Sequence, residues 1–153
     1  MAIQVGDRAP DFSLPTQTGE TVTLAQFLGK QPIVLYFYPK DDTPGCTIEA
    51  CTFRDSYDAF QAAGAAVIGV SSDSIESHQS FASKYSLPFA LASDRDGQLR
   101  KAFGVPNALL VLPGRVTYVI DKAGIVRHQF NDMLNAKAHV SEALAIVQQL
   151  AAA

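Results

Sequence analysis

The sequence predicts an α/β fold in which helices flank a central mixed β-sheet, with an N-terminal β extension. Apolar runs of strand length alternate with segments of helical periodicity, which is the pattern of strand–helix–strand units. A hairpin signal late in the chain adds antiparallel strands to parallel ones. The chain has 153 residues, 48% of them apolar, and no linker-like or repeated stretch, so we expect one domain over residues 1–153.

Four segments rich in β-forming residues are expected as strands. The first, IVLYFY, is a continuous apolar run, as in a central strand that is covered on both faces. The last two are joined by DKAG, a turn sequence typical of a hairpin. The chain up to Leu28 is expected to form the small β extension, with a short helical turn. The four strands are expected at residues 33–38, 66–71, 116–120 and 125–130.

Four helices are expected between and after these strands, at residues 46–63, 74–85, 98–103 and 136–150. In the first, spacings of 4, 3, 4 and 3 place one apolar stripe on one side of the helix. That stripe consists of Cys46, Ala50, Phe53, Tyr57 and Phe60. Gly64 is a plausible end for this helix. In the last helix, the side chains expected to face inward are Val140, Leu144, Ile146 and Val147.

Both cysteines of the chain lie in the stretch YPKDDTPGCTIEACTF, which follows the first central strand. Open α/β sheets tend to place their sites at the carboxyl ends of strands. Pro39 ends the strand and Thr43 leads through Pro-Gly into the helix, so Cys46 is expected in or just before the first helical turn. The unsatisfied N–H groups and the helix dipole at that position stabilise a thiolate. A thiolate is the nucleophile that attacks disulfides and peroxides.

Cys51 requires a separate explanation. On an intact helix it lies about 140° around the axis from Cys46, with Cα atoms roughly 8–9 Å apart. A disulfide requires Cα atoms closer than about 7 Å, so the two cysteines can bond only if the first turns unwind. Cysteine is often a small buried residue, and for Cys51 alone that explanation is as good as a functional one. The five-residue spacing is not typical of zinc, and we predict no metal site and no cofactor.

Composition and charge exclude several classes of function. The formal net charge is -3 and basic residues do not cluster, so no nucleic-acid partner is expected. No apolar run approaches the ~20 residues that span a bilayer, so no membrane association is expected. The first residues lack the features of a secretory signal or a transit peptide, and a cytoplasmic location is expected by default.

Several stretches together resemble one known family, the peroxiredoxins, and most closely their Q type, also called bacterioferritin comigratory protein. YPKDDTPGCTIEAC resembles the family's active-site segment, with its Pro-x-x-x-Thr-x-x-Cys pattern at Pro39, Thr43 and Cys46. GDRAPDFSLPTQTGETVTL resembles the family's opening, and VIGVSSDSIESHQSFASKYSLPFALASDRDGQLRKAFGV its middle. GRVTYVIDKAGIVRHQF resembles the strand that carries the family's essential arginine, here Arg115.

The resemblance implies a thioredoxin-like fold and thiol-dependent peroxidase activity in antioxidant defence and cell redox homeostasis. Cys46 corresponds to the peroxidatic cysteine, which hydrogen peroxide or an organic hydroperoxide oxidises to a sulfenic acid. Cys51 corresponds to the resolving cysteine, which forms an intramolecular disulfide with Cys46 that a thioredoxin-like partner reduces. Thr43 and Arg115 would orient the peroxide, and Pro39 would shield the sulfur. The Q type favours a monomer, and a dimer stays open.

Other residues are given only provisional roles. Taken alone, Arg115 suits a solvated residue at a strand start, and only the resemblance makes it part of the site. Glu49, between the cysteines, is expected on a solvated helix face. Core packing is the first explanation for Tyr38, Phe53 and Tyr57. No role is assigned to the three histidines, which lie in polar surroundings in the sequence: His78, His128 and His139.

The apolar segment VPNALLVLPG, from Val105 to Gly114, is shorter than is common in the Q type. It is expected either to favour apolar hydroperoxides at the pocket or to form a patch for a partner. Two other functions compete with the peroxidase. A disulfide-exchange protein would usually carry Cys-x-x-Cys, which this chain lacks. A non-catalytic binding domain would keep both thiols inert until it unfolds.

Overall fold

A five-stranded mixed sheet forms the centre of the computed structural model, which describes residues 2–105, 107–108 and 112–152. The strand order is β5-β4-β3-β8-β9. β3, β4 and β5 are parallel, β8 runs antiparallel to β3, and β9 antiparallel to β8. The bounds are β3 Ile33–Phe37, β4 Ala66–Ser71, β5 Ala90–Ser93, β8 Val116–Ile120 and β9 Val126–Asn131. The predicted mixed sheet is confirmed.

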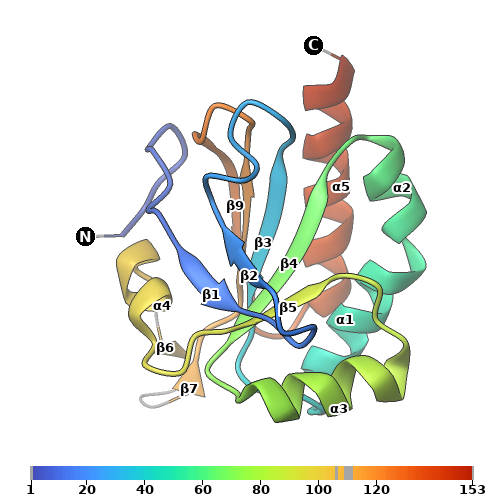
Figure 1. The fold of residues 1–153 in the computed structure, drawn as a ribbon. Coiled ribbons are helices and arrows are strands. Elements are labelled where there is room, and N and C mark those ends of the chain that lie inside the picture. Colours follow the sequence, from blue (N-terminus) through green and yellow to red (C-terminus); the bar gives the residue numbers. More distant parts are fainter. Residues whose placement is uncertain (1, 106, 109–111, 153) are drawn as a thin grey trace.

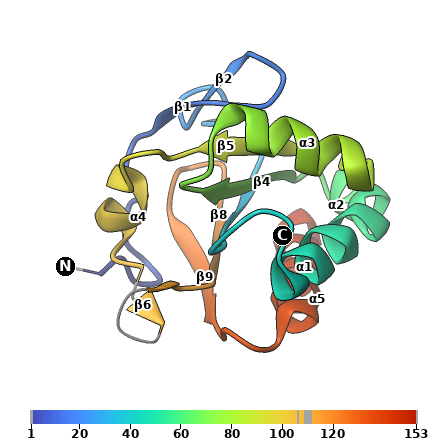
Figure 2. The ribbon, with the colours of Figure 1, turned by 90° about the horizontal axis from the view of Figure 1, so that it is seen from below.

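Helices cover one face of this sheet, and the β extension and one short helix cover the other (Figures 1 and 2). The first layer contains α1 (Pro44–Asp55), α2 (Tyr57–Ala62), α3 (Ile75–Tyr85) and α5 (Ala136–Ala152). The second contains the hairpin of β1 (Ser13–Pro15) and β2 (Thr21–Thr23), together with α4 (Gln98–Phe103). A separate two-stranded pair consists of β6 (Asn107–Ala108) and β7 (Leu112–Pro113).

The fully buried strand β3 supplies both hydrophobic cores. Successive side chains of a strand point to opposite faces, so β3 needs apolar residues at every position. Val34 and Tyr36 pack in the core beneath the four-helix layer. Ile33, Leu35 and Phe37 pack in the core shared with the β extension and α4. The continuous apolar run in the sequence therefore reflects a strand with no solvent-facing side.

The structure departs from the predicted elements in the first helix, at strand β5 and in the β6–β7 pair, which was not expected. The helix expected over residues 46–63 is divided at Ser56, whose backbone (φ -100°, ψ 4°) leaves the helical region. The Asp55–Ser56 pair explains the break, because both side chains favour caps and turns over helix interiors. Strand β5 was not expected, because its four residues, ALAS, include two alanines, which are depleted in strands.

Much of the apolar segment between Val105 and Gly114 lies outside the described residues. The expectation that it borders the pocket or binds a partner therefore stays a prediction. Within the part of the chain that the structure describes, no helix is both long enough and apolar enough to cross a membrane.

The antiparallel pairing of β3 with β8 creates the setting of the site. Phe37, the last residue of β3, pairs with Val116, the first residue of β8. The loop that leaves β3 toward α1 therefore starts beside Arg115, which immediately precedes β8. Helices α1 and α5 lie side by side over this end of the sheet (Figure 2). Residues from three distant parts of the chain converge there.

Candidate active site around Cys46

Cys46 is the third residue of α1 and is almost fully buried, with 2% of its surface exposed. The helix begins at Pro44, whose fixed φ and missing N–H suit a first helical position. Thr43 precedes it in an extended conformation. The predicted placement of Cys46 in the first turn, directly after strand β3 and its loop, is therefore confirmed.

The guanidinium of Arg115 contacts the Cys46 sulfur. Its Nη2 donates a hydrogen bond to Cys46 Sγ at 3.3 Å, and its Nε donates to the carbonyl oxygen of Met133 at 3.2 Å. Its Nη1 donates to Glu49 Oε1 at 2.5 Å. Only 3% of Arg115 is exposed, so a solvated residue at a strand start is the wrong description. A buried guanidinium held at three points is a fixed positive charge aimed at the sulfur.

Glu49 does not lie on a solvated helix face, and that prediction was wrong. It is fully buried, one helical turn beyond Cys46, and forms an ion pair with Arg115. The sequence contained a usable signal, since Glu49 is three residues after Cys46 and four before the buried Phe53. These are the spacings of a single helix face. The position of Glu49 on this face, and not its polar character, determines its burial.

The buried charges around the sulfur perturb one another. Burial raises the pKa of Glu49 to about 8, although the Arg115 guanidinium acts in the opposite direction. Burial alone opposes the charged form of Arg115, but Glu49 and Cys46 together raise its pKa above the ordinary value. Burial lowers the pKa of His139 to about 4, and it raises the pKa of Tyr36 well above its ordinary range. The guanidinium is therefore the dominant charge of the site.

Gly45 makes room for Arg115. A Cβ atom at this position would lie 2.9 Å from Arg115 Nη2, closer than real Cβ contacts come. Among the described residues, the only other contact within 4 Å would be with Cζ of the same guanidinium. Glycine is needed here for the close approach of the cation to the helix start, since its backbone φ is not in the left-handed region.

Two further predicted site residues lie in the loop between β3 and α1. Pro39 is half-buried, two residues beyond the end of β3. The hydroxyl of Thr43 donates to the carbonyl oxygen of Lys40 at 2.8 Å and makes no capping hydrogen bond to α1. Its oxygen lone pairs are therefore available to accept a hydrogen bond from another molecule.

Cys51 lies in the same helix as Cys46 and is half-buried, and both thiols are free. The intact helix agrees with the expectation that the two sulfurs cannot bond until the first turns unwind. Arg54, three residues further along, donates to the carbonyl oxygen of Tyr85 at 2.7 Å and so fastens the end of α1 to α3. The second half of α1 therefore has an anchor separate from the Cys46 site.

A buried polar network holds the loop before Cys46. Asp41 accepts hydrogen bonds from the Tyr38 hydroxyl at 2.5 Å and the Ser77 hydroxyl at 2.8 Å, and its carboxylate lies 2.6 Å from His78 Nδ1. The other ring nitrogen, Nε2, lies 3.1 Å from the carbonyl oxygen of Ala92. His78 is fully buried despite its polar neighbours in the sequence. The network fixes the loop to α3 and to the sheet.

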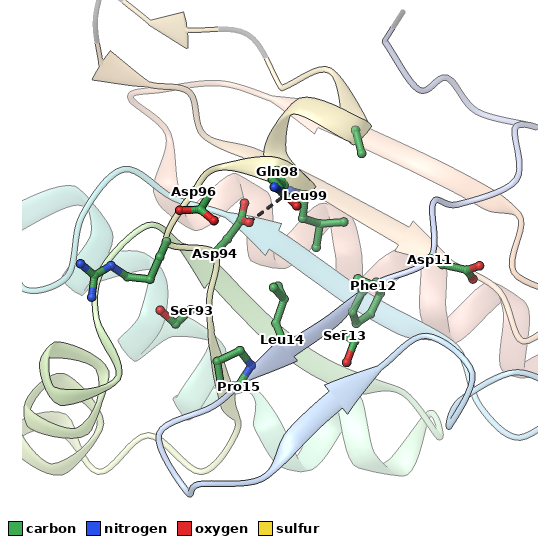
Figure 3. Close-up of a pocket in the computed structure, with 12 residues that line it drawn as sticks. Asp11, Phe12, Ser13, Leu14, Pro15, Ser93, Asp94, Asp96, Gln98 and Leu99 are labelled. Atoms are coloured by element: carbon green, nitrogen blue, oxygen red, sulfur yellow. Dashed lines mark hydrogen bonds between the residues drawn. The ribbon is translucent and has the colours of Figure 1, made fainter.

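A cavity of about 460 Å³ lies on the opposite side of the sheet, between β1, the end of β5 and α4 (Figure 3). Its lining includes Asp11, Asp94 and Asp96, but none of the predicted site residues. The Asp94 carboxylate accepts from the backbone N–H groups of Leu99 and Arg100, so it caps α4. The described residues contain no group of three or more His, Cys, Asp or Glu side chains suited to a metal ion.

Comparison with known proteins finds a matching family, similar sequences and similar solved structures. Residues 5–129 match the model of the AhpC/TSA family. Peroxiredoxin Q, chloroplastic, from Triticum aestivum is 51% identical over 149 residues, which are 97% of this chain and 68% of that protein. The crystal structure of peroxidoxin BcpB from Mycobacterium tuberculosis has a TM-score of 0.89 and 36% identity, covering 97% of this chain and 98% of that one.

A second solved structure is the bacterioferritin comigratory protein of Xanthomonas campestris, described for its alkyl peroxide reduction activity. Its TM-score is 0.85 and its identity 32%, over 97% of this chain and 98% of that one. Both structural relatives exceed 30% identity over nearly their whole length, so the thioredoxin-like fold expected for a peroxiredoxin is confirmed.

The expected cytoplasmic location is contradicted by the relatives. The peroxiredoxin Q proteins of Triticum aestivum, Sedum lineare and Arabidopsis thaliana are all named chloroplastic. The prediction relied on the amino-terminal residues of this chain, and those residues do not decide where the protein acts.

The site and the comparisons lead to the same assignment. Cys46 is buried at the start of a helix with a guanidinium hydrogen-bonded to its sulfur, and the similar proteins match nearly the whole chain. The chain belongs to the AhpC/TSA family, as a peroxiredoxin of the Q type, and is a thiol peroxidase.

Proposed function

We propose that this peroxidase reduces hydrogen peroxide and organic hydroperoxides through Cys46. The thiolate sulfur attacks one peroxide oxygen, an S–O bond forms, and the O–O bond breaks. The departing oxygen takes up a proton and leaves as water or an alcohol. The hydrogen bond from Arg115 Nη2 to Cys46 Sγ supports this proposal most strongly, because it places a fixed cation where negative charge moves from sulfur to oxygen.

Three residues would shape the reaction around the sulfur. Arg115 would stabilise both the thiolate and the charge on the leaving oxygen, since its guanidinium carries several donors in one plane. Thr43 would accept a hydrogen bond from the peroxide O–H, because its own hydroxyl hydrogen is directed at Lys40. Pro39 would limit access of water to the thiolate from the strand side.

We further propose that Cys51 resolves the sulfenic acid. Its thiol would displace the hydroxyl of the sulfenic acid, so that a disulfide and one water molecule form. The first turns of α1 must unwind for this step. The sequence there favours unwinding, since the residues that follow Pro44 in α1, Gly, Cys, Thr and Ile, are all weaker helix formers than Ala or Leu.

A thioredoxin-like dithiol would then return both cysteines to the thiol state by disulfide exchange. This partner and the antioxidant role in cell redox homeostasis are proposed from the relatives. The Xanthomonas campestris protein is described for alkyl peroxide reduction, which supports the inclusion of organic hydroperoxides. Residues 1–153 would act as a single domain in this cycle.

Intact-mass measurement after one equivalent of hydrogen peroxide tests the proposal. Wild type should lose two hydrogens as the disulfide forms. Cys51→Ser should give a sulfenic acid that a dimedone-type reagent traps, and Cys46→Ser should not react. Peroxide consumption by Cys46→Ser at the wild-type rate would overturn the assignment of the nucleophile. A stable sulfenic acid in wild type would overturn only the role of Cys51.

A further inference from the structure

One oxygen of the Glu49 carboxyl has no hydrogen-bond partner among the described residues. Oε1 accepts from Arg115, whereas Oε2 is fully buried and receives no donor. Nδ1 of His139 lies 3.7 Å from Oε2, which is beyond hydrogen-bond distance. A bare carboxylate oxygen buried without a donor is costly, so this oxygen calls for an explanation.

Hydrogen bonds fix the tautomer of His139, and the tautomer supplies the explanation. Nε2 lies 2.6 Å from the carbonyl oxygen of Asp132, which can only accept, so Nε2 carries the hydrogen. Nδ1 lies 2.8 Å from the Thr117 hydroxyl and is the acceptor of that pair in the neutral ring. Nδ1 therefore carries no hydrogen that it could donate to Glu49 Oε2. A carboxylate at this position would stay without that donor, which favours the neutral, protonated form of Glu49.

Four titratable or charged groups face Glu49 from the elements packed around it. Cys46 lies on its own helix, Arg115 just before β8, His139 on α5 and Tyr36 on β3. Arg115 is the only cation of this set when His139 is neutral. If Cys46 and Glu49 were both ionised, two buried anions would share one guanidinium. A single proton shared between the two acids leaves the cluster neutral.

We propose that His139 is a positioning residue that keeps Glu49 in its protonated form near neutral pH, so that the charge of Arg115 is left to the Cys46 thiolate and the peroxide. The inference builds on the proposed roles of Cys46 and Arg115. Arg115 still donates to Oε1 of the neutral carboxyl, so the guanidinium keeps its orientation. The raised pKa of Glu49, about 8, supports the same protonation state.

The test has a direct readout and a kinetic one. In infrared difference spectra between wild type and Glu49→Gln, the carbonyl stretch of a protonated carboxylic acid should be present in wild type near neutral pH. That band should titrate with a midpoint near 8. The rate of Cys46 oxidation, followed by stopped-flow after peroxide mixing, should decline over the same range. Glu49→Gln should lose this alkaline decline, whatever its absolute rate.

His139→Asn tests the role of the histidine. Its amide can rotate to donate a hydrogen bond to Glu49 Oε2, which favours the carboxylate. Both midpoints should fall by about one to two pH units. The matched control is His128→Asn on β9, whose imidazole faces Glu142 near the surface and not Glu49, and which should leave both midpoints in place.

The possible outcomes separate this inference from the proposed function. Absence of the acid band in wild type near neutral pH, or a band that Glu49→Gln leaves unchanged, would overturn the inference even if peroxide reduction proceeds as proposed. An unshifted midpoint in folded His139→Asn would remove the histidine from it. If His139→Asn fails to fold, the wild-type band and its loss in Glu49→Gln still decide the protonation state. A peroxide-reactive Cys46→Ser would instead contradict the proposed function.

Discussion

Replacing Gly45 with alanine should separate the activity of this protein from its stability. The new Cβ would lie 2.9 Å from Arg115 Nη2, and the guanidinium must move to relieve the overlap. The contact it would lose is the hydrogen bond to Cys46 Sγ. A hydrogen bond to a charged group contributes about 1.5–3 kcal/mol. If that amount is lost in the transition state, the rate of Cys46 oxidation falls roughly 10- to 100-fold.

Stability should change little in the same variant. The clash is with the Arg115 guanidinium and not with backbone, so a shift of Nη2 of a few tenths of an ångström that keeps the hydrogen bonds to Glu49 and Met133 can relieve it. Alanine in place of glycine favours the helix by up to about 1 kcal/mol, which offsets part of the lost contact. Urea unfolding should therefore give a free energy within about 1 kcal/mol of wild type.

Stopped-flow measurement of the first oxidation step gives the rate, with Thr47→Ala as the control. Thr47→Ala raises helix propensity in the same turn, but its β-carbon is already present, so it introduces no new contact with Arg115. It should keep the wild-type rate. Gly45→Ala with a wild-type rate would refute the view that the Arg115–Cys46 contact controls the chemistry. A decrease of several kcal/mol in the free energy of unfolding would show that the Arg115 guanidinium cannot move away from the new β-carbon.

Three further predictions concern neighbouring residues. Because the pKa of Glu49 is raised from 4.5 to about 8, its stabilising contribution is present at low pH and is lost as pH rises through 8. The pKa of His139 is lowered from 6.5 to about 4, so this histidine contributes little to the pH dependence of stability above pH 6.5. Between about pH 6.5 and 8, the free energy of unfolding of wild type in urea should therefore fall by about 2 kcal/mol, and Glu49→Gln should abolish this decrease. Asp41→Asn removes the carboxylate from the buried pair with His78 and should cost about 3–5 kcal/mol in the same assay, whereas a cost below about 1 kcal/mol would contradict the pair's importance. Thr43→Val should lower kcat/KM for hydrogen peroxide about fivefold with rescue by Thr43→Ser, and equal values for all three proteins would exclude Thr43 from substrate binding.

The sequence was sufficient for the parts of the site that depend on local order. The apolar run before Pro39, the turn through Pro44 and the helical stripe beyond Cys46 are all short-range patterns, and they placed the cysteine correctly. Arg115 is different, since 69 positions separate it from Cys46. Only the antiparallel register of β3 and β8 brings the two together, and no periodicity in a single sequence encodes that register.

The burial of several polar residues was not predicted from the sequence. Glu49, His78 and His139 are each fully buried, although Glu49 was expected on a solvated helix face and the two histidines were expected in polar surroundings. A charged or titratable residue is ordinarily exposed unless a partner satisfies it, and the partners here come from other elements. Glu49 is hydrogen-bonded to Arg115, His78 to Asp41 and His139 to Thr117. Local composition cannot reveal these pairs because each depends on long-range packing.

The same first turn of α1 must serve two opposed requirements. Peroxide reduction needs the turn folded, because Gly45 admits Arg115 to the sulfur only in that conformation. Resolution by Cys51 needs α1 unwound through its second turn, which also breaks the buried contact of Glu49 with Arg115. Breaking a hydrogen bond from a neutral carboxyl costs about 1 kcal/mol, against about 1.5–3 kcal/mol for a charged one, and a carboxylate would also leave Arg115 unpaired. A protonated Glu49 therefore makes unwinding easier. Above pH 8, Glu49→Gln should consequently form the disulfide faster than wild type when followed by rapid acid quench and intact mass, because both proteins share the ionisation of Cys51 and only wild type acquires the carboxylate.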